Sequence, residues 1–535
     1  MRNNEEKLTV IWRKYQKSKD YMDKKKLVKK TTRNWNFYIG NQWVGCETGG
    51  EELPVLNFIK TVVKYKTAVI SQNQMTAKFS DMNNGAGTEG ICEMLSKMFD
   101  ESWEKSKMTS KVWEVIESAA VQGDSYAFWP DGDTKQPPMV LPNTSVFLGD
   151  ENITDIQKQP YIMIVERLNV AEVKKIAREN GLKDDEIEMI SADNNKDNVI
   201  VNQEEVTDKV TSILFMTKNE DGHVEIARST KSVIYEKQEA LTTKKGEDKT
   251  VIGGLKTYPI VPFIWEKMPF TARGVSEVEQ LIPNQIEVNK TLARRSMTVK
   301  MTAYPRIAYD GTAIQNPEDL EKTGVAIEVN GGAQSVNQMI SYLSTANISG
   351  DADKLQSDLL NLTKDLAGAG DYATGNVNPE QASGQAIIAV RDQAQIPLNK
   401  QVAQFQQFVE DVALLYFDLW TTYNPQGFVY NKETIPLDSV LAVKPSVRVD
   451  VSQDNAWTKL AEQQWADNIF ERQQISFEEY VELCNSNAVP KAKLQAILEK
   501  RMAAQQMQQP AMEPSMEKQM MVDPMAEDMP VPDEM

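Results

Sequence analysis

QASGQAIIAVRDQAQIPLNKQVAQFQQFVEDVALLYFDLW (381–420) favours helix over almost its whole length. Forty helical residues would extend over about 60 Å. We expect Pro397 to kink this helix, because proline removes a backbone hydrogen bond and clashes with the preceding turn. The glycine-rich segment AGAGDYATGNVNPE (367–380) leads directly into it. Apolar residues at three- and four-residue steps predict one buried face: Leu398, Val402, Phe405, Val409, Val412, Tyr416 and Leu419.

Two shorter helical patterns precede this stretch and bracket a turn-rich segment with short strands. The first is GVSEVEQLIPNQIEVNKTLARRSMTVKM (274–301), in which Pro283 marks either a kink or the start of the helix. The second is DADKLQSDLLNLTKDLAG (351–368). Its leucines recur at steps of four, three and four, which predicts that they are buried together: Leu355, Leu359, Leu362 and Leu366.

The N-terminal half changes its period from helix to strand. Residues 4–39, 54–71 and 90–122 carry helical patterns, and the first of these is rich in lysine. Short β-like runs separated by turn residues follow Gly123, with one brief helix over 169–182. PSVRVDVSQ (445–453) predicts one further strand. The sequence therefore predicts an α+β protein that is mainly α.

The C-terminal region divides into two parts of different composition. Residues 455–507 carry helical patterns, including the capping-box sequence SFEE that begins at Ser476. Residues 508–535 contain methionine, proline and acidic residues but no Leu, Ile or aromatic residue. Such a segment buries too little apolar surface to fold, so we expect a disordered tail that is either passive or an adaptable methionine-rich binding segment.

The sequence lacks the residues that several classes of function require. The net charge of −18 argues against a protein that coats nucleic acid through a basic surface. The single histidine, His223, follows an Asp-Gly turn signal, so a Ser-His-Asp triad or an HExxH zinc site is not expected. No GxxxxGK[ST] phosphate-binding loop occurs. The acidic group formed by Asp184, Asp185, Glu186 and Glu188 is typical of a solvated helix face. We therefore expect no cofactor, no metal and no enzymatic activity.

The remaining global features favour a cytosolic product. Cys46, Cys92 and Cys484 lie far apart without CxxC spacing, and we interpret them as reduced thiols. The N-terminus lacks the apolar region of a signal peptide. No run of eighteen apolar residues occurs, so we expect no membrane span.

The order of these elements resembles the portal proteins of tailed bacteriophages over roughly residues 35–500. FYIGNQW (37–43) followed by LPVLNFIKTVVKYKTAVI (53–70) is similar to the N-terminal region of that family. YPIVPFIWEKMPFTARGVSEVEQLIPNQIEVNK (258–290) is similar to its approach to the first stem helix, in which Gly-x-Ser precedes a helix that carries Gln and Asn. The long helix that opens this section resembles the one behind the family's tunnel loop.

The resemblance implies a wedge-shaped subunit with named parts. Residues 1–272 and 421–454 would form the wing, residues 273–300 and 351–367 the two stem helices, and residues 301–350 the clip. Residues 368–380 would be the tunnel loop, 381–420 the long kinked helix and 455–507 the crown, before the tail 508–535.

The resemblance also implies a function and partners. Such proteins form a homo-oligomeric ring, usually of twelve copies, at one capsid vertex of the virion, after assembly in the host cytoplasm. The ring is a channel for double-stranded DNA during packaging and ejection, and it docks the terminase large subunit, a head-tail adaptor, and major capsid and scaffold proteins. The acidic balance fits a channel that does not hold phosphates tightly. The implied tunnel-loop residues are Gly368, Gly370, Asp371, Tyr372, Gly375, Asn376 and Asn378.

Arg294, Arg295 and Lys364 are candidates for transient contacts with the DNA backbone. The alternative for each is an ion pair within or between subunits, with Glu287 and Asp365 among the possible partners. Two other functions remain open for the whole chain: a different virion ring, such as a tail or baseplate component, and a carboxylate-metal nuclease.

Overall fold

The computed structural model describes residues 2–47, 52–71, 73–82, 87–193, 208–238, 255–303, 307–312, 314, 316–322, 325–326, 328, 330, 340–342, 350–366, 368, 396–430, 433–453 and 467–472. The chain divides into two units, Met1–Gln453 and Asp454–Met535. In the second unit only 467–472 is described, and 467–471 is helical. The predicted disordered tail and most of the predicted C-terminal helices lie outside the described residues. Among the described helices, none is both long enough and apolar enough to cross a membrane.

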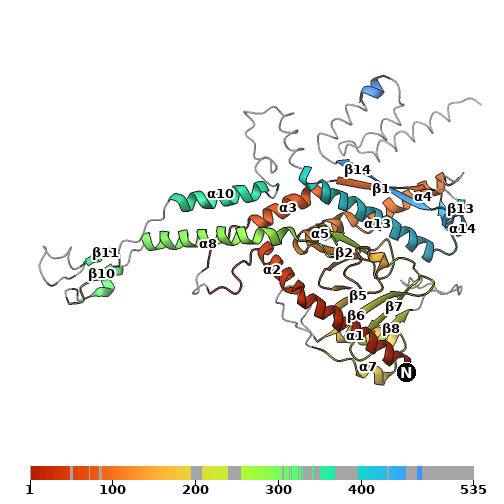
Figure 1. Ribbon diagram of the computed structural model, residues 1–535, viewed down its shortest axis with the longest axis horizontal. Helices are drawn as coiled ribbons and strands as arrows, with labels where there is room; N and C mark the ends of the chain where they lie inside the picture. Colours follow the sequence, from red (N-terminus) through yellow and green to blue (C-terminus); the bar gives the residue numbers. More distant parts are fainter. Residues whose placement is uncertain are drawn as a thin grey trace, which may run out of the picture. The chain divides into compact units, whose positions relative to one another are not determined.

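Five helices form the N-terminal part of the first unit (Figure 1). The predicted helix over 4–39 is two helices, because Lys26 adopts a left-handed φ of 55° between them. Gly40 ends the second one with a left-handed φ of 97°, a conformation that favours glycine at the end of a helix. The five helices are α1 (Arg2–Lys24), α2 (Leu27–Ile39), α3 (Phe58–Ser71), α4 (Glu89–Lys105) and α5 (Met108–Gln122).

The strands predicted after Gly123 form two antiparallel sheets. A three-stranded sheet has the order β3-β2-β9, with β2 (Asp124–Phe128) between β3 (Met139–Pro142) and β9 (Ile260–Ile264). A five-stranded sheet has the sequential order β4-β5-β6-β7-β8. His223 follows the turn between β6 and β7, as predicted. The strands are β4 (Val146–Leu148), β5 (Ile162–Asn169), β6 (Lys209–Lys218), β7 (Val224–Ser229) and β8 (Ile234–Gln238).

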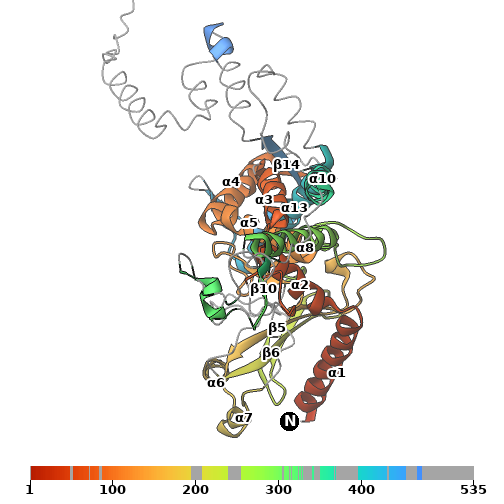
Figure 2. The ribbon, with the colours of Figure 1, turned by 90° about the vertical axis from the view of Figure 1, so that its left-hand side faces the viewer.

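Helices cover both faces of the five-stranded sheet (Figure 2). Ile11 and Tyr15 of α1 pack in one cluster with Ile213 of β6. Val210 of the same strand lies in a different cluster with Val173, because residues at odd spacing in a strand point to opposite faces. Val173 belongs to α6 (Val170–Glu179), which α7 (Asp184–Glu188) follows. The acidic side chains of α7 are largely exposed, as the sequence predicts.

One strand pairing joins segments that are distant in the sequence. β1 (Asn73–Asp81) pairs antiparallel with β14 (Pro445–Gln453), so that Phe79 lies opposite Val447. The strand β14 is predicted from the sequence, whereas β1 is not. A second small sheet pairs β12 (Phe428–Tyr430) with β13 (Glu433–Ile435), and α14 (Leu437–Leu441) follows.

The described part of the long helix begins at Ile396. Pro397 lies in the 3₁₀ turn η3 (Ile396–Leu398), from which α13 (Asn399–Tyr423) continues. Residues 381–395 lie outside the described residues, so the kink remains a prediction. The predicted apolar face of α13 is confirmed except at half-buried Val402. At the centre of this face, Tyr416 contacts Trp129, Phe99 and Trp420. This helix therefore joins the N-terminal helices and the three-stranded sheet into one core.

The two bracketing helices predicted from the sequence lie side by side (Figure 1). They are α8 (Glu277–Ala303), with Pro283 in its first two turns, and α10 (Gly350–Leu366). Of the segment between them, the described parts include β10 (Ile307–Tyr309), which pairs with β11 (Ile340–Tyr342), and η2 (Pro317–Glu321).

Candidate functional site

The start of α8 rests on a close approach of two backbone segments. Gly123 follows α5, and Gly274 lies three residues before α8. A Cβ atom on Gly274 would lie 2.1 Å from the carbonyl oxygen of Gly123. The amide of Trp265 donates a hydrogen bond of 2.9 Å to that same oxygen. Only glycine fits this crossing, which explains the Gly-x-Ser pattern before the helix.

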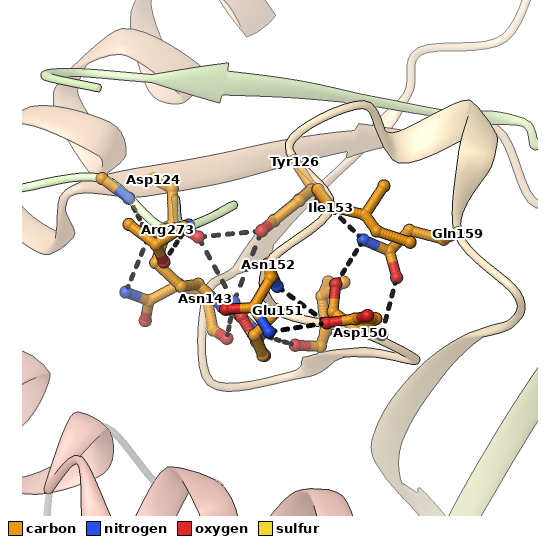
Figure 3. Close-up of polar contacts among 12 residues, drawn as sticks. Asp124, Tyr126, Asn143, Asp150, Glu151, Asn152, Ile153, Gln159 and Arg273 are labelled. Carbon is orange, nitrogen blue, oxygen red and sulfur yellow. Dashed lines mark hydrogen bonds and ion pairs between the residues drawn. The ribbon is translucent and has the colours of Figure 1, made fainter. Parts of the chain in front are cut away.

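Arg273 holds the loop before α8 to the sheets (Figure 3). Its Nε and Nη2 atoms each donate a hydrogen bond of 2.9 Å to the carboxylate of Glu151. It also donates to the carbonyls of Asn143 and Val146, at 3.0 and 2.7 Å, and pairs with Asp124 at 3.3 Å. The guanidinium thus joins the loop to β2, to the end of β3 and to β4, with bidentate geometry that a lysine cannot reproduce.

Burial governs the electrostatics of this cluster. Burial raises the pKa of the Asp124 carboxyl, and the neighbouring Arg273 guanidinium limits that rise. Burial alone would lower the pKa of Arg273, but the carboxylates of Glu151 and Asp124 outweigh it and raise that pKa. The charges therefore compensate each other inside the protein, which is the condition under which buried charges are tolerated.

The first turn of α8 is fixed by a hydroxyl and a buried ion pair. Ser276 Oγ accepts a hydrogen bond from the amide of Val278 and donates to the carbonyl of Val121 at 2.6 Å, so it caps α8 and ties it to α5. Lys66 Nζ of α3 lies 2.7 Å from Glu277 Oε1, and Trp265 Nε1 donates to Glu277 Oε2 at 3.2 Å. Both charged residues of the pair are buried.

Two buried amides continue this attachment two to three turns further along α8. Gln285 Oε1 accepts from the amide of Phe58 at 3.2 Å, and its Nε2 donates to the carbonyl of Leu56 at 2.7 Å. Asn289 donates to the side chain of Gln42 and accepts from the amide of Leu56. Asn289 is the last buried residue of α8, which is described throughout. The buried residues of α8 therefore all lie in its first half.

Helix α10 packs antiparallel along α8. Asn284 donates a hydrogen bond of 3.0 Å to Thr363, and Arg295 lies 3.4 Å from Gln356. The prediction that the leucines of α10 are buried together is only partly right. Leu359 is half-buried, but the side chains of Leu355 and Leu362 are 55% and 59% exposed. The reason is that Thr363 and Gln356, not those two leucines, lie on the side that faces α8.

The structure places only some of the predicted site residues. Gly368 lies in a turn with a φ of 69°, a conformation that suits glycine. Arg294 is exposed on α8, Lys364 is half-buried on α10, and Arg295 is engaged with Gln356 as described. The other tunnel-loop candidates lie outside the described residues: Gly370, Asp371, Tyr372, Gly375, Asn376 and Asn378.

Sequence reasoning missed the charged anchors of α8, namely Arg273, Glu151, Lys66 and Glu277. Their partners are far apart in the chain, so spacing gave no signal for them. Among the residues that the structure describes, no group of three or more His, Cys, Asp or Glu side chains is placed to hold a metal ion. The anchor is therefore an arrangement that positions a helix, and it carries no evident chemistry.

Comparison with known proteins identifies the class. The family model of the phage P22-like portal protein matches residues 13–426, which is most of the chain. The chain therefore belongs to the phage P22-like portal protein family, as its resemblance to portal proteins predicts. It is a structural, non-enzymatic protein of the phage virion.

Two of the solved structures that are similar to this chain each share 10% sequence identity with it and superpose with a TM-score of 0.33. One is the virion of a native gene transfer agent particle, which aligns with 79% of this chain and 88% of its own. The other is the neck of an empty gene transfer agent particle computed with C6 symmetry, with 79% and 89% covered. No curated protein matches the chain.

Proposed function

We propose that this protein forms a ring, of twelve copies, at one capsid vertex and that double-stranded DNA passes through the ring during packaging and ejection. The family match over residues 13–426 carries this proposal. The anchoring of α8 supports it, since a rigidly mounted helix pair with an exposed outer half suits a subunit that must meet its neighbours in a fixed orientation.

The parts of the subunit follow from the same proposal. Residues 1–272 and 421–454 form the wing, α8 and α10 the stem, and the segment between them the clip. Residues 368–380 form a tunnel loop that meets the DNA, and residues 381–420 carry the long helix from the wing to the channel. Arg294, Arg295 and Lys364 are the proposed basic residues of the stem.

The clip is the proposed docking site for the terminase large subunit and later for the head-tail adaptor. The ring also meets the major capsid and scaffold proteins during assembly. An ATP-driven motor supplied by another protein agrees with the absence of a phosphate-binding loop in this sequence.

Negative-stain electron microscopy of the purified full-length protein tests the ring. We expect closed rings in end-on views, with twelve-fold rotational symmetry and an axial hole wide enough for duplex DNA. Filaments, or rings without an open axis, would overturn the proposal in favour of another virion component.

A binding assay tests the clip separately. We expect immobilised rings to retain the phage's own terminase large subunit, and rings with residues 307–342 replaced by a short Gly-Ser linker to lose it. The control is retention of the capsid protein, which the linker variant should keep. Equal terminase binding by both rings would refute this assignment.

A further inference from the structure

A cleft of about 540 Å³ lies beside α13. Gln404, Phe408, Asp411 and Leu415 line it and recur at steps of four, three and four residues, so one side of the helix forms one of its walls. The other walls come from β9, from the loop that follows β9 and from the turn η1 (Ile156–Lys158). A cleft of this volume lies in the range of sites that take ligands.

The inner part of this cleft is apolar. Phe408 and Leu415 of α13 are buried there, as is Ile264 of β9. Leu414 and Met268 also line the cleft, and their side chains are 40% and 50% exposed. Apolar surface of this kind gains free energy when another apolar group covers it. The cleft therefore offers an apolar floor with apolar edges that are open to solvent.

One carboxylate interrupts the apolar lining. Asp411 lies between Phe408 and Leu415 on the same side of α13, and it is half-buried. Gln407 donates a hydrogen bond of 3.0 Å to this carboxylate. Among the residues that the structure describes, no lysine or arginine forms an ion pair with it, and exposed Lys267 acts on it only through its charge. The carboxylate thus lacks a cation that would compensate its burial.

The surroundings of this carboxylate favour a positive charge. Burial raises the pKa of Asp411, and the hydrogen bond from Gln407 limits that rise. The charges of Glu410 and Asp155 raise the pKa further, whereas Lys267 lowers it. Asp155 already has a lysine partner at 3.1 Å, and Glu410 does not line the cleft. A cation placed at Asp411 would offset both its burial and the neighbouring negative charges.

The loop after β9 holds an aromatic residue in a strained and exposed position. Phe270 has a left-handed φ of 61°, and its side chain is 87% exposed. Lys267 forms a β-bridge with Gly274, and the amide of Ala272 donates a hydrogen bond of 2.8 Å to the carbonyl of Glu151. Backbone strain at a bulky residue persists where its surroundings enforce it. The fold therefore presents an apolar tip on the loop that borders the cleft.

We propose that this cleft docks a segment of another protein in which a lysine or arginine lies between apolar residues. The basic side chain would lay its methylene stem over Phe408 and Leu415 and place its charged end at Asp411. Its apolar neighbours would cover Leu414 and Met268 at the edges of the cleft. This inference adds a partner surface to the proposed function and does not depend on the ring.

A basic peptide fits the cleft better than other ligands do. DNA would bring phosphates to Asp411, which repels them. A metal ion needs several ligands, but within the described parts of the chain no group of three or more metal-binding side chains occurs. A free amine would satisfy Asp411 but would leave the exposed tip at Phe270 uncovered. A peptide supplies both the cation and the apolar contacts.

Selection of random heptapeptides on the immobilised full-length protein tests the inference. The Asp411→Asn protein serves for counter-selection, because asparagine keeps the shape of the side chain and removes its charge. We expect the enriched peptides to share a lysine or arginine flanked by apolar residues. The absence of enrichment that depends on Asp411, or a consensus without a basic residue, would overturn the proposal.

Fluorescence anisotropy of the strongest selected peptide distinguishes a site from a diffuse negative field. We expect Asp411→Asn to weaken binding at least about tenfold. The matched control is Glu410→Gln, which removes the adjacent charge outside the cleft and should weaken binding less than about fivefold. Lys267→Met should tighten binding, because it removes a competing cation. Equal losses in Asp411→Asn and Glu410→Gln would refute the site.

The same measurement on isolated subunits and on assembled rings separates this inference from the proposed function. We expect both forms to bind the peptide. Binding by subunits but not by rings would show that a second copy covers the cleft, and it would overturn the inference. Subunits that bind the peptide but never form rings would support the inference while refuting the ring.

Discussion

Replacing Lys66 with methionine should loosen the start of α8 more than any surface charge change. The substitution keeps the length of the side chain but leaves the Glu277 carboxylate buried without its cation. Removing one partner of a buried ion pair costs about 3–5 kcal/mol. Trp265 still donates to the same carboxylate, so we expect about 3 kcal/mol. If the free energy of locally opening the start of α8 falls by that amount, amide hydrogen exchange there becomes about 150-fold faster.

Hydrogen-exchange mass spectrometry of assembled full-length protein measures this effect. We expect the acceleration in peptides that cover residues 277–289 and little change in α13. The double variant Lys66→Met, Glu277→Gln should recover most of the protection, because the glutamine carries no charge and still accepts from Trp265. The matched control is Lys111→Met, which removes the partly exposed pair with Glu114 and should leave exchange in α8 unchanged.

Unchanged exchange over 277–289 in Lys66→Met would refute the reasoning that this pair anchors the helix. Equal acceleration in the single and double variants would also contradict it. In that case the loss would come from the packing of the lysine stem rather than from an uncompensated carboxylate.

Three further predictions concern other parts of the chain. Gly274→Ala should destabilise the protein by at least about 1–3 kcal/mol, because backbone atoms block the new methyl group; thermal unfolding of assembled rings checks this. Burial raises the pKa of Asp411, so ionisation of this carboxyl opposes folding. The stability that its protonated form contributes is fully present below the unfolded pKa of about 3.9 and is lost as the pH rises through the folded pKa. Urea titrations at several pH values should therefore show a smaller loss of stability with rising pH in Asp411→Asn, and the same pH dependence in the variant and the unmodified protein would contradict this. Replacing Gly370 and Gly375 with proline should slow DNA packaging in vitro while rings form normally, and an unchanged packaging rate would count against the tunnel-loop assignment.

The sequence predicts those elements whose stabilising contacts follow a local period. The buried face of α13 is an example, since its apolar steps of three and four residues show which side meets the core. The strands of the five-stranded sheet are another, because each lies beside its neighbour in the chain and is bounded by turn residues. Gly274 and Ser276 were visible as a pattern, although their reason, the crossing with Gly123, was not.

The elements that were missed depend on contacts between distant segments. Strand β1 pairs with β14 across more than three hundred residues. Its own sequence, NQMTAKFSD, alternates apolar Met75, Ala77 and Phe79 with polar residues, but this short run has a single β-branched residue and was not recognised as a strand. Arg273 has its partners in three other segments, so no spacing could mark it. Leu355 and Leu362 looked like core residues because the period of a helix shows a face but not which surface will cover it.

The polar nature of the α8 anchor has a consequence for the ring. An apolar stripe alone would let a helix turn or slide by a residue at small cost, whereas Gln285 and Asn289 each bond to fixed backbone groups near Leu56. A shift of one residue would break these bonds and leave buried polar groups unpaired, which costs about 1–3 kcal/mol for each group. It would also rotate the exposed half of α8 by about 100° about the helix axis. The buried amides thus fix the direction in which the exposed half of α8 points, and a Gln285→Leu variant should produce misclosed or broken rings of the proposed kind even where the fold itself survives.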